Sequence, residues 1–189
     1  MAETVARSEF ILGGQKSGKS RRAEGLARQW LDASPGTHRA VLIATGQALD
    51  DEMCERIARH RRERAERVPG MATVEEPLAL AQALHEHGTP HTLVVVDCLT
   101  LWLTNLLMPA EGVAADVSEP TKSLCDAIGA ARGPVVLVGN EIGLGVIPLG
   151  RETRAFVDAL GGLNQAVAAA CDRVTLMAAG LPLCLKDPE

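Results

Sequence analysis

The stretch that decides the fold is GGQKSGKS at residues 13–20, which matches the pattern G-x-x-x-x-G-K-[ST] at every fixed position. The apolar run FIL at 10–12 precedes it, and an Ala- and Arg-rich segment with helical character follows at about 19–30. Strand, glycine-rich loop and helix in this order bind phosphate, because glycines let successive backbone N–H groups converge on phosphate oxygens at a helix N-terminus. The alternative interpretation is an ordinary glycine-rich turn.

Within this phosphate loop, each residue type has an expected part in binding a nucleoside triphosphate. The Lys19 ammonium is expected to reach the β- and γ-phosphates, and the Ser20 hydroxyl is expected to coordinate Mg²⁺. Phosphate contacts are therefore predicted for Gly13, Gly14, Gln15, Lys16, Ser17, Gly18, Lys19 and Ser20.

The rest of the chain alternates short apolar runs with helical segments, which is typical of an α/β fold with a mainly parallel sheet flanked by helices. The pattern predicts strands at 10–12, 40–44, 92–96, 134–138, 173–177 and 183–185. It predicts helices at 19–30, 50–66, 77–87, 99–107, 119–131 and 151–170. Loops are expected at 109–118 and at 139–150, and the second of these, which contains four glycines and a proline, is expected to be functional.

The composition of the chain limits the classes of protein to which it can belong. The 189 residues are 47% hydrophobic, which indicates a single globular domain over 1–189, with a helical excursion at about 50–90. The net charge of −5 argues against general nucleic-acid binding. No apolar run of about 18 residues suggests a membrane span, and the N-terminus lacks the apolar core of a secretory signal. The five scattered cysteines fit reduced thiols, so we expect a cytoplasmic protein.

An acidic residue follows the most apolar predicted strand. Asp97 comes directly after VVV at 94–96, which is where phosphate-loop proteins place a carboxylate near Mg²⁺. The alternative is that Asp97 caps the helix expected from about Leu99. The guanine-reading pattern N-K-x-D of switch GTPases is absent, since residues 140–143 are Asn-Glu-Ile-Gly.

One histidine lies within a cluster of arginines. On the helix predicted at 50–66, Leu49, Met53, Ile57 and His60 share one face, so His60 is expected to point toward the protein body. One interpretation is a histidine at the core edge, on a helix whose arginines and glutamates form a solvated face. The other is an imidazole nucleophile beside the phosphate site. The arginines are Arg56, Arg59, Arg61, Arg62, Arg64 and Arg67.

Several longer segments together resemble a known family over nearly the whole chain. They are IATGQALDDEMCERIARHR at 43–61, TVEEPL at 73–78, VDCLTLWLTNLL at 96–107 and GNEIGLGVIPLGRETRAFVDALGGLNQ at 139–165. With the phosphate loop, they resemble the bifunctional adenosylcobinamide kinase/adenosylcobinamide-phosphate guanylyltransferase family of coenzyme B12 synthesis.

The resemblance implies a RecA-like P-loop NTPase fold, a homotrimer, and two reactions. ATP or GTP phosphorylates the aminopropanol hydroxyl of adenosylcobinamide. GTP then guanylylates a histidine, by position His60, and the GMP passes to adenosylcobinamide phosphate to give adenosyl-GDP-cobinamide. Lys19 is the second catalytic residue that we expect.

Further nucleotide contacts are also implied by the resemblance. They are Thr45, Gly46, Gln47, Arg61, Arg62, Glu63, Arg64, Glu75 and Asp97, with Ser20 and Asp97 as the ligands of Mg²⁺. Two other functions remain open from the residues themselves: a P-loop kinase of a small molecule with a single activity, and a nucleotide-binding module that performs no transfer.

Overall fold

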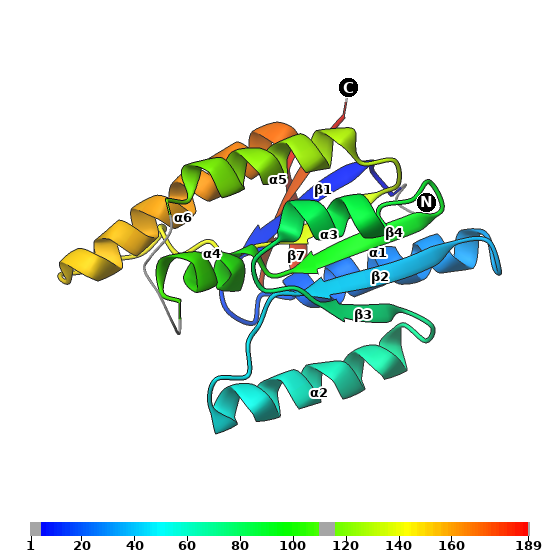
Figure 1. Ribbon diagram of the computed structural model, residues 1–189, viewed down its shortest axis with the longest axis horizontal. Helices are drawn as coiled ribbons and strands as arrows, with labels where there is room; N and C mark the ends of the chain where they lie inside the picture. Colours follow the sequence, from blue (N-terminus) through cyan, green and yellow to red (C-terminus); the bar gives the residue numbers. More distant parts are fainter. Residues whose placement is uncertain (1–4, 110–115, 189) are drawn as a thin grey trace.

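The computed structural model describes residues 5–109 and 116–188, in which one sheet of seven strands is flanked by helices (Figure 1). The strands are β1 (Ser8–Gly13), β2 (Arg39–Ala44), β3 (Ala72–Glu75), β4 (Thr92–Asp97), β5 (Val135–Val138), β6 (Arg173–Ala178) and β7 (Leu181–Lys186). The helices are α1 (Lys19–Ala33), α2 (Asp51–Arg67), α3 (Leu80–His87), α4 (Leu99–Leu107), α5 (Ser118–Ala130) and α6 (Arg151–Ala170).

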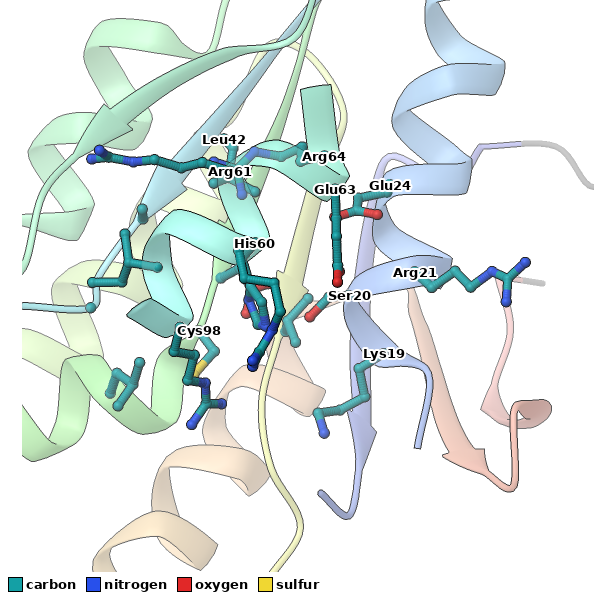
Figure 2. Close-up of a pocket in the computed structure, with 18 of the residues that line it drawn as sticks. Lys19, Ser20, Arg21, Glu24, Leu42, His60, Arg61, Glu63, Arg64 and Cys98 are labelled. Carbon is teal, nitrogen blue, oxygen red and sulfur yellow. The ribbon is translucent and has the colours of Figure 1, made fainter. Parts of the chain in front are cut away.

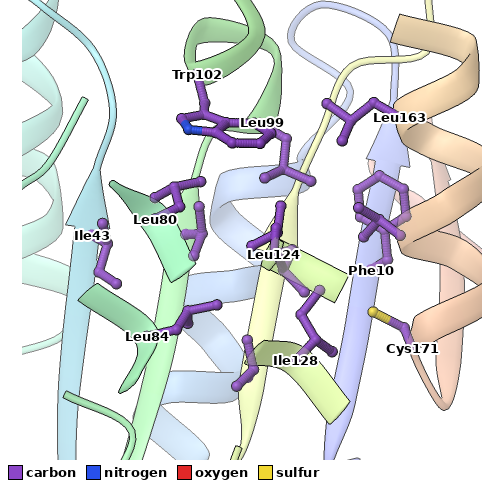
Figure 3. Packing of buried hydrophobic residues seen from close by; sticks show 14 of the residues in the cluster. Phe10, Ile43, Leu80, Leu84, Leu99, Trp102, Leu124, Ile128, Leu163 and Cys171 are labelled. Carbon is purple, nitrogen blue, oxygen red and sulfur yellow. The ribbon is translucent and has the colours of Figure 1, made fainter. Parts of the chain in front are cut away.

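The sheet separates two apolar layers, because neighbouring side chains of a strand point to opposite faces. In β4, Val94 and Val96 pack on the layer beneath α3, α4, α5 and α6, part of which Figure 3 shows. Leu93 and Val95 pack on the opposite layer, against α1. Both faces of the central strands are therefore buried, which explains their continuous apolar runs.

The strand order is β3-β2-β4-β5-β1-β6-β7, and only β7 runs antiparallel to its neighbour. β5 lies between β1 and β4, and its Val138 is in register with Ile11 on one side and with Asp97 on the other. The carboxyl ends of β1 and β4 therefore meet at one edge of the sheet, which is where ligands bind in open α/β sheets. The predicted α/β P-loop fold is confirmed.

Two predictions about the segment after α2 were wrong. β3 was not predicted, since its side chains are mostly exposed and it joins the sheet through backbone pairing with β2. α3 begins at Leu80 rather than at Pro77. The Pro77 carbonyl accepts a hydrogen bond from Asn105 Nδ2 at 3.0 Å, and the Leu78 carbonyl accepts one from Trp102 Nε1 at 2.8 Å. These carbonyls are thus held outside the helix.

α2 lies beyond the β3 edge of the sheet (Figure 1) and buries only Arg64 among its residues. Its start follows the sequence pattern, with the Asp50 side chain accepting a hydrogen bond from the Met53 N–H at 2.7 Å. Its C-terminal half is held by polar contacts: Arg67 pairs with Glu24 of α1 at 2.6 Å.

The loop expected at 109–118 is described only in part, because residues 110–115 lie outside the described residues. Among the helices that the structure describes, none combines the length and apolar character needed to cross a bilayer.

Candidate nucleotide site

The phosphate loop has a backbone conformation that two of its glycines make possible. Gly18 adopts φ +101° and Gly13 adopts φ +152°, both in the region that L-residues with a Cβ rarely occupy. A Cβ on Gly13 would also lie 2.5 Å from the Met177 carbonyl oxygen and 2.6 Å from Ser17 Oγ. The pattern therefore specifies glycine here for a steric reason. α1 begins at Lys19, so the last two residues of the phosphate loop lie in its first turn.

Lys19 is the buried cation of this loop. Its Nζ donates a hydrogen bond to the Gly14 carbonyl at 2.7 Å, so the side chain folds back along the loop that it follows. Burial lowers the pKa of the Lys19 ammonium, while the nearby Asp97 carboxylate opposes that shift. A desolvated ammonium at a helix N-terminus is suited to the concentrated negative charge of a triphosphate.

A cavity of about 360 Å³ opens between the phosphate loop and α2 (Figure 2). Figure 2 shows His60 extending from α2 into this space, on the side opposite Lys19 and Ser20. The lining residues that the sequence predicted are Gln15, Lys16, Ser17, Gly18, Lys19, Ser20, Gly46, His60, Arg61, Glu63, Arg64, Glu75 and Asp97.

Five predicted contacts do not line this cavity: Gly13, Gly14, Thr45, Gln47 and Arg62. Arg62 is exposed and lies two positions, about 200° of helical turn, from His60, so it points away from the cavity. The α2 residues that do line it recur at helical spacing, as in Met53, Ile57 and His60. The predicted orientation of these three is confirmed, whereas Leu49 precedes α2 and is exposed.

Several lining residues were not predicted as nucleotide contacts. Arg56 lies one helical turn before His60, and that spacing was the available signal. Others come from strand ends or loops far apart in the chain, where no local pattern marked them. The unpredicted lining residues are Arg21, Glu24, Leu42, Ala44, Met53, Arg56, Ile57, Arg59, Arg67, Cys98, Leu101, Val138 and Asn140.

Two of the lining side chains, those of His60 and Cys98, carry a nitrogen or sulfur atom that could form a covalent bond to phosphorus. Burial, together with the neighbouring Asp97 carboxylate, raises the pKa of the Cys98 thiol to about 11. Cys98 is thus a protonated thiol at neutral pH and a poor nucleophile. The His60 ring is partly exposed in the cavity and, within the described part of the chain, makes no hydrogen bond to the protein.

Ser20 and Asp97 both line the cavity at the carboxyl edge of the sheet. The capping alternative for Asp97 is wrong, since the N-cap position of α4 is Cys98 and no side chain caps that helix. The described residues contain no cluster of three or more His, Cys, Asp or Glu side chains that could hold a metal ion. One carboxylate and one hydroxyl fit Mg²⁺, which binds nucleotide phosphates with few protein ligands.

Thr45 is fully buried, and its hydroxyl both donates a hydrogen bond to the Cys98 backbone and accepts one from it. Thr45 Oγ1 donates to the Cys98 carbonyl at 2.7 Å and accepts from the Cys98 N–H at 2.9 Å. The Thr45 N–H donates to the Asp97 carbonyl at 3.2 Å. Thr45 thus fixes the segment that carries Asp97.

We expect Thr45→Val to destabilise the fold, because it leaves the partly buried Cys98 N–H and carbonyl without the Thr45 hydroxyl as their partner. The expected loss in the free energy of unfolding is about 1–3 kcal/mol, measured by urea denaturation. Thr45→Ser keeps the hydroxyl and should recover most of that loss. Equal stability of the valine variant and the wild type would contradict this role.

Comparison with protein families gives a match to the family model described as cobinamide kinase / cobinamide phosphate guanyltransferase, over residues 9–185. The chain is 47% identical to the bifunctional adenosylcobalamin biosynthesis protein CobP of Pseudomonas aeruginosa, over 94% of this chain and 96% of that protein. It is 36% identical to the bifunctional adenosylcobalamin biosynthesis protein CobU of Escherichia coli, over 94% of this chain and 98% of that protein.

A solved structure with a similar fold is the flagellar accessory protein FlaH from Methanocaldococcus jannaschii. The TM-score is 0.58 at 10% sequence identity, and the match covers 99% of this chain and 82% of that one. At this identity, the similarity concerns the fold alone.

Proposed function

Since the chain belongs to the cobinamide kinase / cobinamide phosphate guanyltransferase family, and is thus a bifunctional kinase and nucleotidyltransferase, we propose that its guanylyl transfer proceeds through a covalent GMP adduct of His60. In the kinase reaction, ATP or GTP phosphorylates the aminopropanol hydroxyl of adenosylcobinamide. In the second reaction, GMP from GTP passes through His60 to adenosylcobinamide phosphate, giving adenosyl-GDP-cobinamide.

The observation that carries this proposal is the position of His60 across one cavity from the phosphate loop. A triphosphate held by the loop N–H groups and Lys19 would extend toward α2, where the imidazole is the available nucleophile. Cys98, the nearest rival, is a thiol at neutral pH, because burial raises its pKa to about 11. Within the described part of the chain, no protein group hydrogen-bonds to the ring of His60, so a ring nitrogen is available to attack phosphorus.

Guanylylation would proceed by attack of a neutral His60 ring nitrogen on the α-phosphorus of GTP. The N–P bond forms, the bond from that phosphorus to the oxygen bridging the β-phosphate breaks, and pyrophosphate leaves toward Lys19 and the phosphate loop. A phosphate oxygen of adenosylcobinamide phosphate then attacks the same phosphorus. The N–P bond breaks, and its electron pair returns to the ring.

Positive charge around the cavity lowers the barrier to both steps, since in each step an anionic or electron-rich group approaches a phosphate. Arginine side chains are suited to this part because the guanidinium stays charged and binds phosphate oxygens in pairs. The arginines of α2 that line the cavity are Arg56, Arg59, Arg61, Arg64 and Arg67.

We assign Mg²⁺ to Ser20 and Asp97, where it would offset phosphate charge during transfer. Asp97→Asn should therefore raise the Mg²⁺ concentration that gives half-maximal kinase activity, by roughly tenfold, because a neutral amide is a weaker ligand for a hard cation. The measurement is a Mg²⁺ titration at fixed nucleotide. Asp126→Asn on α5 removes a carboxylate away from the cavity and serves as the control. An unchanged Mg²⁺ requirement would contradict the assignment.

The remaining features implied by the family complete the proposal. Residues 1–189 would act as one nucleotide-binding domain in a cytoplasmic homotrimer. Size-exclusion chromatography with light scattering tests the assembly, with a mass three times that of the chain as the expected result.

Product analysis tests the two reactions. With γ-labelled ATP, we expect label on adenosylcobinamide; with α-labelled GTP and adenosylcobinamide phosphate, we expect label on adenosyl-GDP-cobinamide. A kinase of single activity would give the first product alone, and a nucleotide-binding module would give neither.

A further inference from the structure

The loop between β5 and α6 exposes a group of large apolar side chains. Their exposed fractions are 43% for Ile142, 81% for Leu144, 97% for Val146, 76% for Ile147 and 97% for Leu149. We call these five residues the apolar loop. Residues 142–150 contain no charged side chain. Large exposed apolar patches on a protein surface mark interaction or ligand-binding sites.

Hydrogen bonds hold both ends of this segment in place. At its start, the Glu141 N–H donates to the Gly13 carbonyl at 3.1 Å, and the Asn140 N–H donates to Thr100 Oγ1 at 2.9 Å. At its end, Arg154 of α6 donates to the Pro148 carbonyl at 3.0 Å. The apolar side chains are thus presented to solvent by an anchored backbone.

The segment begins at the nucleotide cavity. Asn140 lines that cavity, and its neighbour Glu141 bonds to Gly13, the first residue of the phosphate loop. The Glu141 carboxylate accepts a hydrogen bond from the Gly143 N–H at 2.7 Å, so this carboxylate stabilises the turn at the start of the apolar loop. The apolar loop therefore begins two residues after Asn140, at the rim of the nucleotide cavity.

We propose that the apolar loop binds the corrin ring of the acceptor in both reactions. This inference rests on the proposed function, because the acceptor is taken from it. The reacting hydroxyl or phosphate of a cobinamide sits on a side chain of a large macrocycle, which a cavity of about 360 Å³ shared with a nucleotide does not hold. The ring must then lie outside the cavity, and its methyl-bearing edge and neutral amides match an apolar, uncharged surface.

The test is a double variant, Leu144→Gln with Val146→Gln, which changes two exposed side chains. We expect the KM for adenosylcobinamide and for adenosylcobinamide phosphate to rise at least about tenfold, because two side chains that the acceptor would cover become polar. The KM for GTP, and the amount of GMP bound covalently in the absence of acceptor, should stay unchanged. The matched control is Leu183→Gln on β7, which is also exposed and apolar but lies at the far edge of the sheet.

The outcomes separate this inference from the proposed function. Unchanged KM values for both acceptors in the double variant would overturn the corrin assignment, while wild-type kinase and transfer activities would leave the proposed function intact. A lower oligomeric state of the double variant in sedimentation velocity would also overturn it, by identifying the occupant of the loop as a second copy of the chain. Absence of both activities in the wild type would refute the proposed function itself.

Discussion

His60→Ala is expected to abolish the covalent retention of label from α-labelled GTP, because the cavity then lacks its imidazole nucleophile. Guanylyl transfer to adenosylcobinamide phosphate should fall by at least about 1000-fold, as for the loss of other covalent nucleophiles. The kinase reaction should persist, since in the proposed function it uses the phosphate loop and not the imidazole. The measurement is label on denatured protein, followed by assays of each product.

The chemistry of the adduct gives a second way to recognise it. A phosphoramidate on histidine should survive alkali and be lost in mild acid, and mass spectrometry should place it on the peptide that contains His60. His85→Ala is the matched control, because His85 is exposed on α3, away from the cavity. Label that persists in His60→Ala, or that maps to His38, His85, His87 or His91, would contradict the mechanism.

Lys19→Ala is expected to impair both reactions together, because one phosphate loop serves both nucleotide substrates in the proposed function. Removing a preorganised, charged donor from the transferred or leaving phosphates should lower kcat/KM by about 100-fold or more. The variant should keep its fold, because the ammonium bonds within the protein to the carbonyl of Gly14, an exposed residue that water can solvate instead.

The control for this variant is Lys122→Ala, which removes the same charge from an exposed position on α5. It should leave both activities near the wild-type value. If Lys19→Ala impaired the kinase reaction alone, the two reactions would use separate nucleotide sites, and the single-cavity proposal would be refuted. Steady-state kinetics with each acceptor makes the distinction.

The two variants, His60→Ala and Lys19→Ala, distinguish the roles of the two walls of the cavity. His60 on α2 is expected to matter to one reaction, and Lys19 on α1 to both. This division follows from the way the cavity is built, with the phosphate loop on one wall and the arginine-rich helix on the other. The ion pair of Arg67 with Glu24 joins the two walls at 2.6 Å.

The sequence by itself determined the phosphate loop, the buried strands and the face of α2 that carries His60. Each is a local feature: consecutive backbone N–H groups, side chains alternating along a strand, or residues three and four apart on a helix. A local pattern of this kind does not depend on contacts with distant residues, so it can be recognised from the sequence alone.

Only the tertiary structure decided which residues around these features reach the cavity. The hydroxyl of Thr45 hydrogen-bonds to the backbone of Cys98, which is 53 residues away in the chain. Because of this contact, the Thr45 side chain is buried and does not line the cavity. β3 forms because its backbone pairs with that of β2. Its side chains are mostly exposed, so they give no apolar pattern that would predict a strand. Contacts between distant segments depend on strand order and register, and these are set by the packing of the whole sheet.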